Sequence, residues 1–537
     1  MNDILIKLLN MRGIEDEDSI KEFLSDSPKL TYDPLLLPDM DEGTDLILSE
    51  IKKGSKVMIY GDYDADGITS TTLMLSILSK LMPMERLDYY IPSRFEEGYG
   101  LNREAIKSIS DRGFNFIITV DCGSVSKEEV EYAKELGLKI LVTDHHTITD
   151  TVADCLLINP KKPGSKYPFS ELSGCGVAFK VAQILQKKAG LPKSVLNEVL
   201  DLVAIGTIGD IMPLIDENRT MIKYGLKVIN RGERVGLNKL ICGTSLKMGS
   251  LTSENVGYII VPHLNASGRI EDASLAVKLL SIEDSKELDD IVSDILYKNQ
   301  ERKRIQNETF NQCMDLLPKD MAEIDDFILL KVDDAHEGIA GIVAGKLKEE
   351  FYRPVAIVIG EKGTSRSIDD VDLYNLLKNH EELFTRFGGH KGACGFTIPE
   401  ENFEKLKVGL LKDMEDIKEK NPNVFERKAH YELEINTDQI TTELAEELLK
   451  LEPFGTKNPK PVFKLNNIKP KDIRYMGNDN QHVRFFADRI QCVGFSLADK
   501  LNDAMKESDA ISITGCIELS MWQGQKRLQF IVEEILH

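Results

Sequence analysis

Acidic and imidazole side chains follow three apolar segments of this chain, and their types and spacing suit metal chemistry. They are Asp62, Asp64, Asp66, Asp121, Asp144, His145 and His146. The preceding segments, 57–60, 116–120 and 140–143, are apolar and β-branched, and helix-like sequence separates them. This alternation predicts a parallel α/β sheet. Because the carboxyl ends of parallel strands meet at one edge, we expect these side chains to converge there.

A cluster of carboxylates predicts a bound cation, because buried like charges are costly unless a counter-ion lies among them. A mixture of carboxylate and imidazole ligands suits a divalent transition metal such as Mn²⁺. Each residue alone has a structural explanation, since Asp66 before Gly67 resembles a helix N-cap and Asp121 resembles a turn residue. Capping does not account for all of these groups at one sheet edge. The combination therefore predicts a metal site, with two ions.

Four segments resemble, in order, the motifs of the DHH phosphoesterases. They are residues 61–67, the turn at Asp121, the triplet 144–146 and residues 206–210. Within that superfamily the chain is most similar to the RecJ family of single-strand-specific DNA exonucleases. The similarity continues almost end to end, through residues 264–269, 336–344, 388–396 and 453–459.

The pattern of elements and the resemblance together predict an α/β protein with several domains. We expect an N-terminal helical segment at 1–44 and a DHH catalytic domain with a parallel sheet at 45–282. The charged, helically spaced stretch 283–318 predicts a connecting helix. A smaller α/β domain of the DHHA1 type at 319–420 and a β-barrel at 428–537, which the resemblance names an OB-fold, complete the chain.

The resemblance implies a role for each residue of the predicted metal site. The catalytic residues would be Asp62, Asp64, Asp66, Asp121, His145, His146 and Asp210, and the metal ligands among them Asp64, Asp66, Asp121, His145 and Asp210. Asp62 would be an added ligand or a carboxylate behind the ligands. His146 would orient the site or donate a proton to the leaving oxygen, because two adjacent His side chains cannot easily face one metal in the same way. Tyr60 stands where several relatives place a His, so we expect the second ion to bind more weakly or to be completed by substrate.

A second set of residues suits the phosphates of a nucleic acid. It comprises Arg94, Asn265, Arg269, Thr364, Arg366, Gly388, Gly389 and His390. Guanidinium groups bind phosphate oxygens bidentately, and a glycine-rich turn at 388–392 would let backbone approach an anion. Any one of these arginines could instead be a surface ion-pair partner. We expect 264–269 to form a loop, and in the family such neighbourhoods receive the 5′-terminal phosphate and the strand backbone.

Composition indicates a globular protein of a reducing environment. The chain has 537 residues, 42% hydrophobic and 29% charged, enough for several domains with substantial cores. No segment is apolar and long enough to span a bilayer, and the N-terminus lacks the features of an export signal. The eight cysteines show no Cys-x-x-Cys pairing. We therefore expect a cytoplasmic protein without disulfides or a structural zinc site.

The net charge of the chain argues against nucleic-acid binding, unless the charge is unevenly distributed along the sequence. The chain carries −22 at pH 7, whereas a sequence-independent DNA binder usually carries a basic surface. Residues 453–537, however, hold 12 Lys and Arg against 10 Asp and Glu. The same segment holds aromatic residues, most of which we expect in its core and one or two of which could stack on bases. They are Phe454, Phe463, Tyr475, Phe485, Phe486, Phe495, Trp522 and Phe530.

From the resemblance we expect a 5′-to-3′ exonuclease that degrades single-stranded DNA to mononucleotides in DNA repair and recombination. Two Mn²⁺ or Mg²⁺ ions would activate water and clamp the attacking and leaving oxygens. The resemblance also implies a monomer that works with a helicase and a single-strand-binding protein. Two alternatives stay open. One is a DHH phosphodiesterase acting on short oligonucleotides, cyclic dinucleotides or pyrophosphate, which the added segment 428–537 disfavours. The other is a non-catalytic DNA-binding scaffold, which the intact acidic and His residues disfavour.

Overall fold

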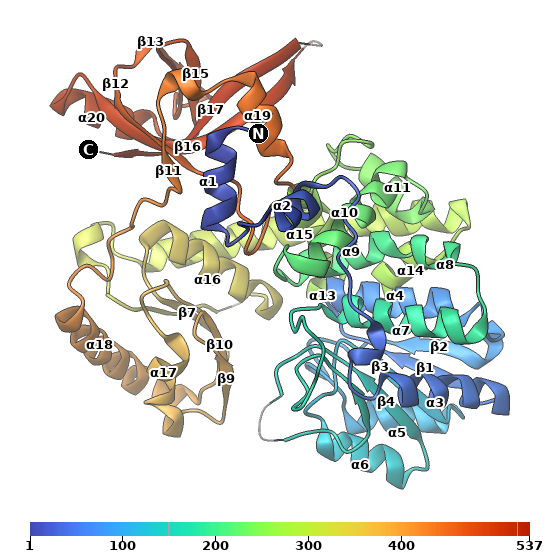
Figure 1. The fold of residues 1–537 in the computed structure, drawn as a ribbon. Helices are drawn as coiled ribbons and strands as arrows, with labels where there is room; N and C mark the ends of the chain where they lie inside the picture. Colours follow the sequence, from blue (N-terminus) through green and yellow to red (C-terminus); the bar gives the residue numbers. More distant parts are fainter. Residues whose placement is uncertain (149–150, 334, 523–524, 537) are drawn as a thin grey trace. The chain divides into compact units, whose positions relative to one another are not determined.

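Three β-sheets organise the chain in this computed structural model, which describes residues 1–148, 151–333, 335–522 and 525–536. By its internal contacts the chain divides into two compact units, whose elements are labelled in Figure 1. The first unit contains Met1–Asn265, Ala273–Val292 and Ala429–His537. The second contains Ala266–Asp272 and Ser293–Lys428.

A five-stranded parallel sheet carries the predicted metal-binding segments. Its strands are β1 (Val57–Tyr60), β2 (Leu87–Tyr90), β3 (Phe116–Val120), β4 (Lys139–Thr143) and β5 (Leu156–Ile158), in the order β2-β1-β3-β4-β5. Every neighbouring pair is parallel, as predicted. β1 and β3 are buried along their whole length, in agreement with their continuous apolar sequences. The carboxyl ends of these strands therefore lie at one edge of the sheet.

The first unit also contains most of the helices. They are α1 (Asp3–Met11), α2 (Glu17–Leu24), α3 (Met40–Lys53), α4 (Ala65–Leu78), α5 (Arg103–Asp111), α6 (Lys127–Glu135), α7 (Gly174–Ala189), α8 (Ser194–Asn197), α9 (Leu200–Gly209), α10 (Asp216–Arg231), α11 (Val235–Cys242), α12 (Ser253–Asn255) and α14 (Ser274–Ser281). α4 is buried at almost every position, and α9 is buried from Asp201 to Thr207. α4 begins beside the acidic segment after β1 and α9 ends at Asp210, so buried helices position these acidic residues.

One segment predicted as a loop is a helix. Residues 264–269 lie in α13 (Val261–Ile270), which continues a π-helical turn at Val256–Ile260. The small and polar residues after Leu264 do not predict a helix locally. Leu264 and Ala266 are nevertheless fully buried, and this tertiary burial stabilises the helix.

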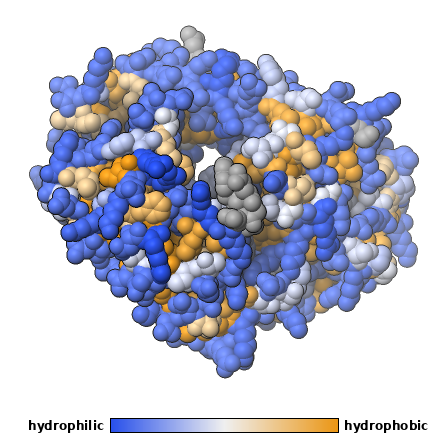
Figure 2. Space-filling view, turned by 90° about the horizontal axis from the view of Figure 1, so that it is seen from above, coloured by the Kyte–Doolittle hydropathy of each residue, from blue (hydrophilic) through white to orange (hydrophobic). Residues whose placement is uncertain are grey.

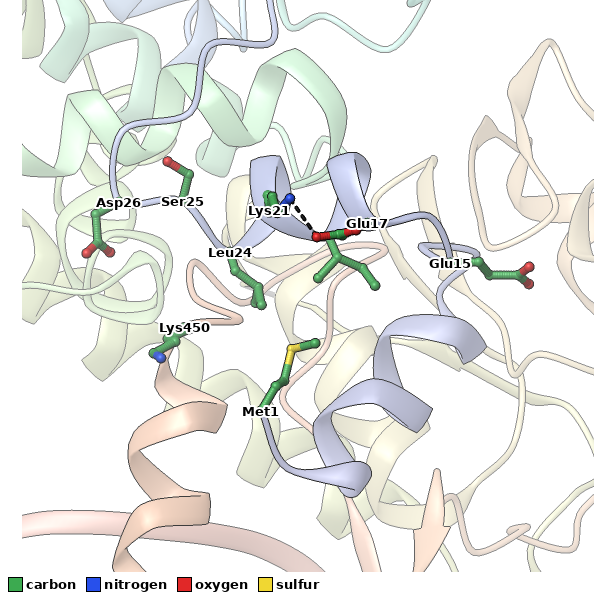
Figure 3. A pocket seen from close by; sticks show the side chains of 9 residues that line it. Met1, Glu15, Glu17, Lys21, Leu24, Ser25, Asp26 and Lys450 are labelled. Atoms are coloured by element: carbon green, nitrogen blue, oxygen red, sulfur yellow. Dashed lines mark ion pairs between the residues drawn. The ribbon is translucent and has the colours of Figure 1, made fainter.

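The N-terminal helices pack on the C-terminal domain and border a cavity. Leu5 and Leu8 of α1 are buried in the hydrophobic core of the C-terminal barrel. A cavity of about 670 Å³ is lined by both polar and apolar residues, and Figure 3 shows an ion pair between Lys21 and Glu17 in its wall. None of the residues predicted for catalysis lines this cavity.

The second unit contains a mixed sheet in the order β6-β7-β8-β10-β9. Its elements are α15 (Ser285–Leu316), β6 (Ile328–Lys331), α16 (Glu337–Phe351), β7 (Val355–Ile359), β8 (Lys362–Arg366), α17 (Leu373–Lys378), β9 (Arg386–His390), β10 (Ala393–Thr397) and α18 (Phe403–Lys420), of which α15 begins in the first unit. Residues 388–390, predicted within a glycine-rich turn, lie instead on the edge strand β9. These residues pair with β10 in an antiparallel hairpin, and Gly is required at 389 because a Cβ there would lie 2.6 Å from the Cys394 Cα.

The C-terminal strands form the predicted β-barrel. They are β11 (Leu433–Glu434), β12 (Phe463–Ile468), β13 (Lys471–Met476), β14 (His482–Ala487), β15 (Ile490–Gly494), β16 (Ile511–Trp522) and β17 (Gln525–Leu536), accompanied by α19 (Thr442–Leu449) and α20 (Ala498–Glu507). The sheet order is β11-β12-β16-β17-β15-β14-β13. β12 and β13 are consecutive in sequence but lie on opposite sides of this order, so the short connection between them closes the sheet, as in an OB-fold.

The loop 453–459 joins the barrel to the parallel-sheet domain within the first unit. The amide of Leu214 donates a hydrogen bond to the carbonyl of Thr456 at 2.8 Å. The buried guanidinium of Arg219 donates to the carbonyl of Leu451 at 2.9 Å. The backbone that follows α9 is thereby tied to the barrel.

The molecular surface agrees with the composition. The face drawn in Figure 2 is largely hydrophilic, with separate apolar patches. Over the ranges that the structure describes, none of the helices combines the length and the hydropathy needed to cross a bilayer.

Candidate metal centre

The loop after β1 and the first turn of α4 position three acidic residues. Asp62 lies in the loop, Asp64 is the N-cap of α4 and Asp66 lies in the first turn. Asp64 accepts hydrogen bonds from two amides of that turn at 2.9 and 3.1 Å, so the capping role considered for Asp66 belongs to Asp64. The Asp66 carboxylate instead accepts from the amides of Gly174 and Cys175, at 2.6 and 2.9 Å, at the start of α7.

Glycines allow the segments around these carboxylates to approach closely. A Cβ at Gly174 would lie 2.5 Å from the Asp121 side chain, and one at Gly206 would lie 2.5 Å from Asp66 Oδ1. Asp121 itself has a φ of 62°, in the left-handed region that Asp tolerates better than most residues. The glycines within the recognised motifs therefore meet a steric requirement of the site.

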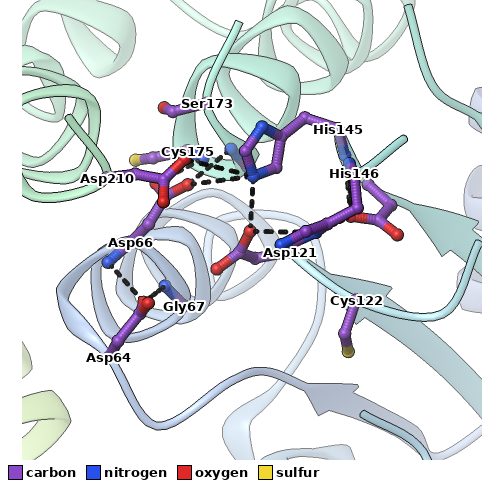
Figure 4. A network of polar contacts seen from close by, with 12 residues as sticks. Asp64, Asp66, Gly67, Asp121, Cys122, His145, His146, Ser173, Cys175 and Asp210 are labelled. Atoms are coloured by element: carbon purple, nitrogen blue, oxygen red, sulfur yellow. Dashed lines mark hydrogen bonds and ion pairs between the residues drawn. The ribbon is translucent and has the colours of Figure 1, made fainter. Parts of the chain in front are cut away.

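Side chains from distant segments converge on His145, as Figure 4 shows. The Nε2 of His145 lies 3.1 Å from Asp121 Oδ1, 3.4 Å from Asp210 Oδ2 and 3.8 Å from Asp66 Oδ2. His145 and Asp121 follow β4 and β3, Asp66 comes shortly after β1, and Asp210 follows α9. The sheet edge and the end of α9 therefore bring these residues together.

The ligand atoms fall into groups of three, and within each group the atoms lie within 4.8 Å of one another. The groups are Asp62, Asp64 and Asp121; Asp66, His145 and Asp210; and Asp121, His145 and His146. Because the first two groups share no residue, the arrangement has room for two cations. Oxygen ligands with an added imidazole suit Mn²⁺ or Mg²⁺.

Several buried atoms of this cluster have no hydrogen-bond partner among the described residues. They are Asp62 Oδ1, Asp121 Oδ1, both ring nitrogens of His145, and Asp210 Oδ2. Leaving a buried polar atom unpaired costs about 1–3 kcal/mol, so natural sites seldom accumulate them without a ligand. The residues present therefore fit a bound divalent metal.

Burial and mutual repulsion raise the pKa values of the carboxyl groups. The pKa of Asp66 is raised to about 7 by burial and by neighbouring Asp64, and that of Asp210 to about 8 by burial and by Asp66. Burial and neighbouring carboxylates also raise the pKa values of Asp62 and Asp121 well above the ordinary range. A cation among these groups would favour their ionised forms, which again matches a metal site.

The two adjacent histidines differ in charge. Burial and the nearby charge of His146 lower the pKa of His145 to about 3, so its ring is neutral and able to bind a metal. Burial also acts to lower the pKa of His146, but the hydrogen bond and the charge of Asp144 outweigh it and raise the pKa to about 9. The Nδ1 of His146 lies 2.8 Å from Asp144 Oδ1, and its side chain is 43% exposed. A protonated, half-exposed imidazole at this place suits proton donation.

Asp144 and Tyr99 also belong to the site. Asp144 was expected at this sheet edge but had no catalytic or ligand role assigned from the sequence, and Tyr99 was not predicted. Asp144 is buried and accepts hydrogen bonds from three backbone amides as well as from the ring of His146. The hydroxyl of Tyr99 lies 3.0 Å from His146 Nδ1 and donates to the carbonyl of Asp121 at 3.2 Å. The place of Asp144 in the Asp-His-His triplet was an available signal. No local pattern indicated Tyr99, because it comes from the separate segment between β2 and α5.

Two of the predicted phosphate-binding residues lie in the first unit. The guanidinium of Arg94 stacks on the ring of Tyr63 with its Cζ 4.7 Å from the ring centroid, beside the acidic loop. Asn265 has a buried Oδ1 without a hydrogen-bond partner among the described residues. Both side chains can therefore present polar atoms to a ligand.

Two of the predicted residues in the second unit, Arg269 and Arg366, lie against α16. The Nη1 of Arg269 donates to the carbonyl of Gly338 at 3.1 Å, in the first turn of the helix. A Cβ at Gly341 would lie 2.8 Å from the Nη2 of Arg366, so that guanidinium also packs on α16. Two guanidinium groups at the start of a helix suit a phosphate. Strands β8 and β9 carry the others, which are Thr364 on β8 and Gly388, Gly389 and His390 on β9.

Comparisons with known proteins identify the family. The DHH family, N-terminal domain, matches residues 56–207, the DHHA1 domain matches 325–414 and the RecJ OB domain matches 431–534. Over 99% of its length the chain is 37% identical to the single-stranded-DNA-specific exonuclease RecJ of Bacillus subtilis, of which it covers 67%. The chain belongs to the RecJ family. It is also 31% identical to the RecJ of Dickeya dadantii, over 86% of this chain and 83% of that relative. The crystal structure of RecJ from Thermus thermophilus in complex with Mn²⁺ covers 99% of this chain with a TM-score of 0.85 and 27% identity, and the match spans 75% of that chain.

Tyr60 is the residue from which a weaker second metal site was expected. Its ring lies in a hydrophobic core cluster of the parallel-sheet domain. Its hydroxyl donates to the carbonyl of Gly100 at 3.0 Å. Tyr60 is therefore engaged in the core and offers no additional metal ligand.

Proposed function

We propose that this chain is a metal-dependent exonuclease that degrades single-stranded DNA from its 5′ end to mononucleotides, in DNA repair and recombination. The observation that carries the proposal is the convergence of acidic and His side chains at one sheet edge, where several buried ligand atoms have no hydrogen-bond partner among the described residues. Two relatives whose similarity covers 99% of this chain are named single-stranded-DNA-specific exonucleases. These names support the choice of substrate.

The side chains of the centre support a hydrolytic mechanism. We assign Asp62, Asp64, Asp66, Asp121, His145 and Asp210 as the ligands of two Mn²⁺ or Mg²⁺ ions. Ions held by these residues would supply an activated water and neutralise phosphoryl oxygens. His146, held by Asp144 and protonated at neutral pH because its pKa is about 9, donates a proton to the leaving oxygen. Tyr99 contacts the same ring and restricts its orientation.

The residues around α16 support recognition of the 5′-terminal phosphate. Arg269 and Arg366 both contact the first turns of this helix, and the dipole of the helix favours an anion at its N-terminus. We propose that Arg94 and Asn265 of the first unit contact the sugar-phosphate backbone of the DNA strand. In the second unit we propose the same role for residues on β8 and β9, which are Thr364, Gly388, Gly389 and His390.

The barrel supports binding of the strand beyond the active site. Its aromatic residues sort by burial, and Phe454, Phe463, Phe485 and Phe530 are buried in the core. Phe495 is 61% exposed and packs edge-on against His482, with ring centroids 5.5 Å apart. Tyr475 is 43% exposed, and the side chain of Trp522 lies outside the described residues. We propose Phe495 and His482 as a stacking platform for bases.

The family and the cysteines support a setting for this activity. All eight cysteines are free thiols, as expected in a reducing compartment. We propose a cytoplasmic monomer that acts on strands unwound by a helicase and covered by a single-strand-binding protein.

The test is digestion in Mn²⁺ of a long single strand, the matching duplex and a dinucleotide. Mononucleotides released only from the single strand, starting at its 5′ end, support the proposal. Activity confined to the dinucleotide would favour a small-substrate phosphodiesterase, and binding without cleavage would favour a scaffold. His145→Ala should abolish turnover while leaving the fold intact, whereas Asp111→Asn, at an exposed position of α5, should leave turnover unchanged. A comparison of 5′-phosphorylated and 5′-hydroxyl strands tests the phosphate site.

A further inference from the structure

Ile211 has a backbone conformation that its side chain disfavours. It follows Asp210, the C-cap of α9, and has a φ of 56°. Its amide donates to the carbonyl of Ile208 at 3.1 Å. The next amide, of Met212, donates to the carbonyl of Thr207, also at 3.1 Å. This pair of bonds is a Schellman motif, in which Gly usually occupies the left-handed position because a β-branched residue is strained there.

Packing does not explain the choice of Ile at this position. The Ile211 side chain is 73% exposed, so it gains little from burial. A Gly would relieve the strain and lose almost no packing. An exposed apolar residue alone needs no explanation, but one that also maintains an unfavourable backbone conformation indicates a functional constraint.

The position of Ile211 relates it to the proposed metal centre. The neighbouring residue, Asp210, places its Oδ2 3.4 Å from His145 Nε2. The turn that carries Ile211 therefore borders the site where the phosphodiester reacts. A side chain exposed at this border can meet the parts of the substrate adjacent to the phosphate.

A second exposed side chain comes from a segment packed on the same end of α9. The π-helical turn Val256–Ile260 contacts α9, since a Cβ at Gly257 would lie 3.3 Å from Ile208 Cγ2. Tyr258, in this turn, is 82% exposed. π-helical turns occur frequently at functional sites. An aromatic and an aliphatic side chain are thus both uncovered on adjoining segments at the end of α9 that carries Asp210.

We propose that Ile211 and Tyr258 contact the unpaired nucleobases next to the phosphodiester being cut. This inference rests on the proposed exonuclease function and deepens it. Nucleobases are the apolar parts of a polynucleotide and have faces free for contact only in a single strand. Aromatic rings stack on such faces without sequence preference. The reacting phosphate and the nucleobases next to it belong to the same strand. A strand whose phosphate lies at the metal centre therefore brings its bases to Ile211 and Tyr258.

The test separates stability, strand binding and chemistry. Ile211→Gly should raise Tm, because it removes backbone strain, and should raise KM for a long single strand about fivefold or more. Hydrolysis of bis(p-nitrophenyl) phosphate, which carries no nucleobase, should be unchanged. Ile211→Asn tolerates the same backbone without the apolar group and should reproduce the KM effect. Tyr258→Ala should also raise KM, and Tyr258→Phe should retain the wild-type value.

The matched control is Val408→Ala, at a 68% exposed aliphatic position of α18, which should alter none of these quantities. An unchanged KM in Ile211→Gly and Tyr258→Ala would overturn the inference. A parallel fall in bis(p-nitrophenyl) phosphate hydrolysis would also overturn it, because Ile211 would then act by holding Asp210. If the wild-type protein itself fails to degrade single strands, the proposed function fails instead, whatever the variants do.

Discussion

Replacing Asp121 by Asn should stabilise the metal-free protein and remove its response to metal. The oxygens of Asp62, Asp64 and Asp121 lie within 4.8 Å of one another. Two unit charges at that separation repel by about 3.5 kcal/mol at an effective dielectric constant of about 20. Because raised pKa values keep part of this charge neutralised by protons, we expect Asp121→Asn to gain about 2 kcal/mol in EDTA at pH 8.5, or roughly 4–8 °C in Tm.

Thermal unfolding followed by circular dichroism, in EDTA and in Mn²⁺, measures both effects. The wild-type protein should gain about 2.7 kcal/mol when Mn²⁺ is present at about 100 times its Kd, and Asp121→Asn should gain much less. The order of the two Tm values should therefore reverse on adding Mn²⁺. Asp111→Asn, which changes an exposed carboxylate, should behave as wild type. A lower Tm of Asp121→Asn in EDTA, or an undiminished shift in Mn²⁺, would refute the reasoning.

Four further outcomes follow from contacts within the first unit. Mn²⁺ affinity, measured by calorimetry, should rise from pH 6 to pH 8.5 with release of protons, because the pKa values of Asp66 and Asp210 are raised to about 7 and about 8; a pH-independent affinity would contradict this. The same two raised pKa values make the stability of the metal-free protein depend on pH. In the folded protein Asp66 and Asp210 still hold protons that they have lost in the unfolded chain, so the free energy of unfolding should fall as the pH rises through about 7 to 8. His146→Gln should lower kcat by about 10²–10⁴-fold while the Tm shift in Mn²⁺ persists, and loss of that shift would make His146 a ligand rather than a proton donor. Lys180 Nζ and Glu217 Oε2 form an ion pair at 2.6 Å, and both side chains are fully buried. Lys180→Met should cost about 3–5 kcal/mol in urea unfolding, because it leaves Glu217 charged and buried, and adding Glu217→Gln should restore much of that loss; equal costs for the single and double variants would argue against the ion pair.

Local sequence was sufficient for the elements that carry the metal centre. The apolar runs predicted β1 and β3 with their observed bounds, and β4 begins one residue earlier than predicted, at Lys139. A buried strand needs a continuous apolar run, and such a run can be read without knowledge of its neighbours. The common direction of parallel strands then sufficed to expect Asp121 and His145 at one edge.

Prediction failed where contacts between distant segments outweigh local preference. Residues 264–269 form part of α13 because Leu264 and Ala266 are buried by other elements, although their sequence is poor in helix signals. Gly389 lies on a strand rather than in a turn because it pairs with Cys394 of β10, a contact that leaves no room for a side chain at 389. Neither contact leaves a trace in the local pattern.

The sequence by itself determined which acidic and imidazole groups share a sheet edge, because strand periodicity and the order of elements along the chain are local properties. Only the tertiary structure decided how those groups are used. It placed Asp144 behind His146 and Tyr99 against the same ring, and it left Ile211 uncovered beside Asp210. Protonation and exposure depend on what surrounds a side chain in space, and that surrounding is assembled from segments far apart in the sequence.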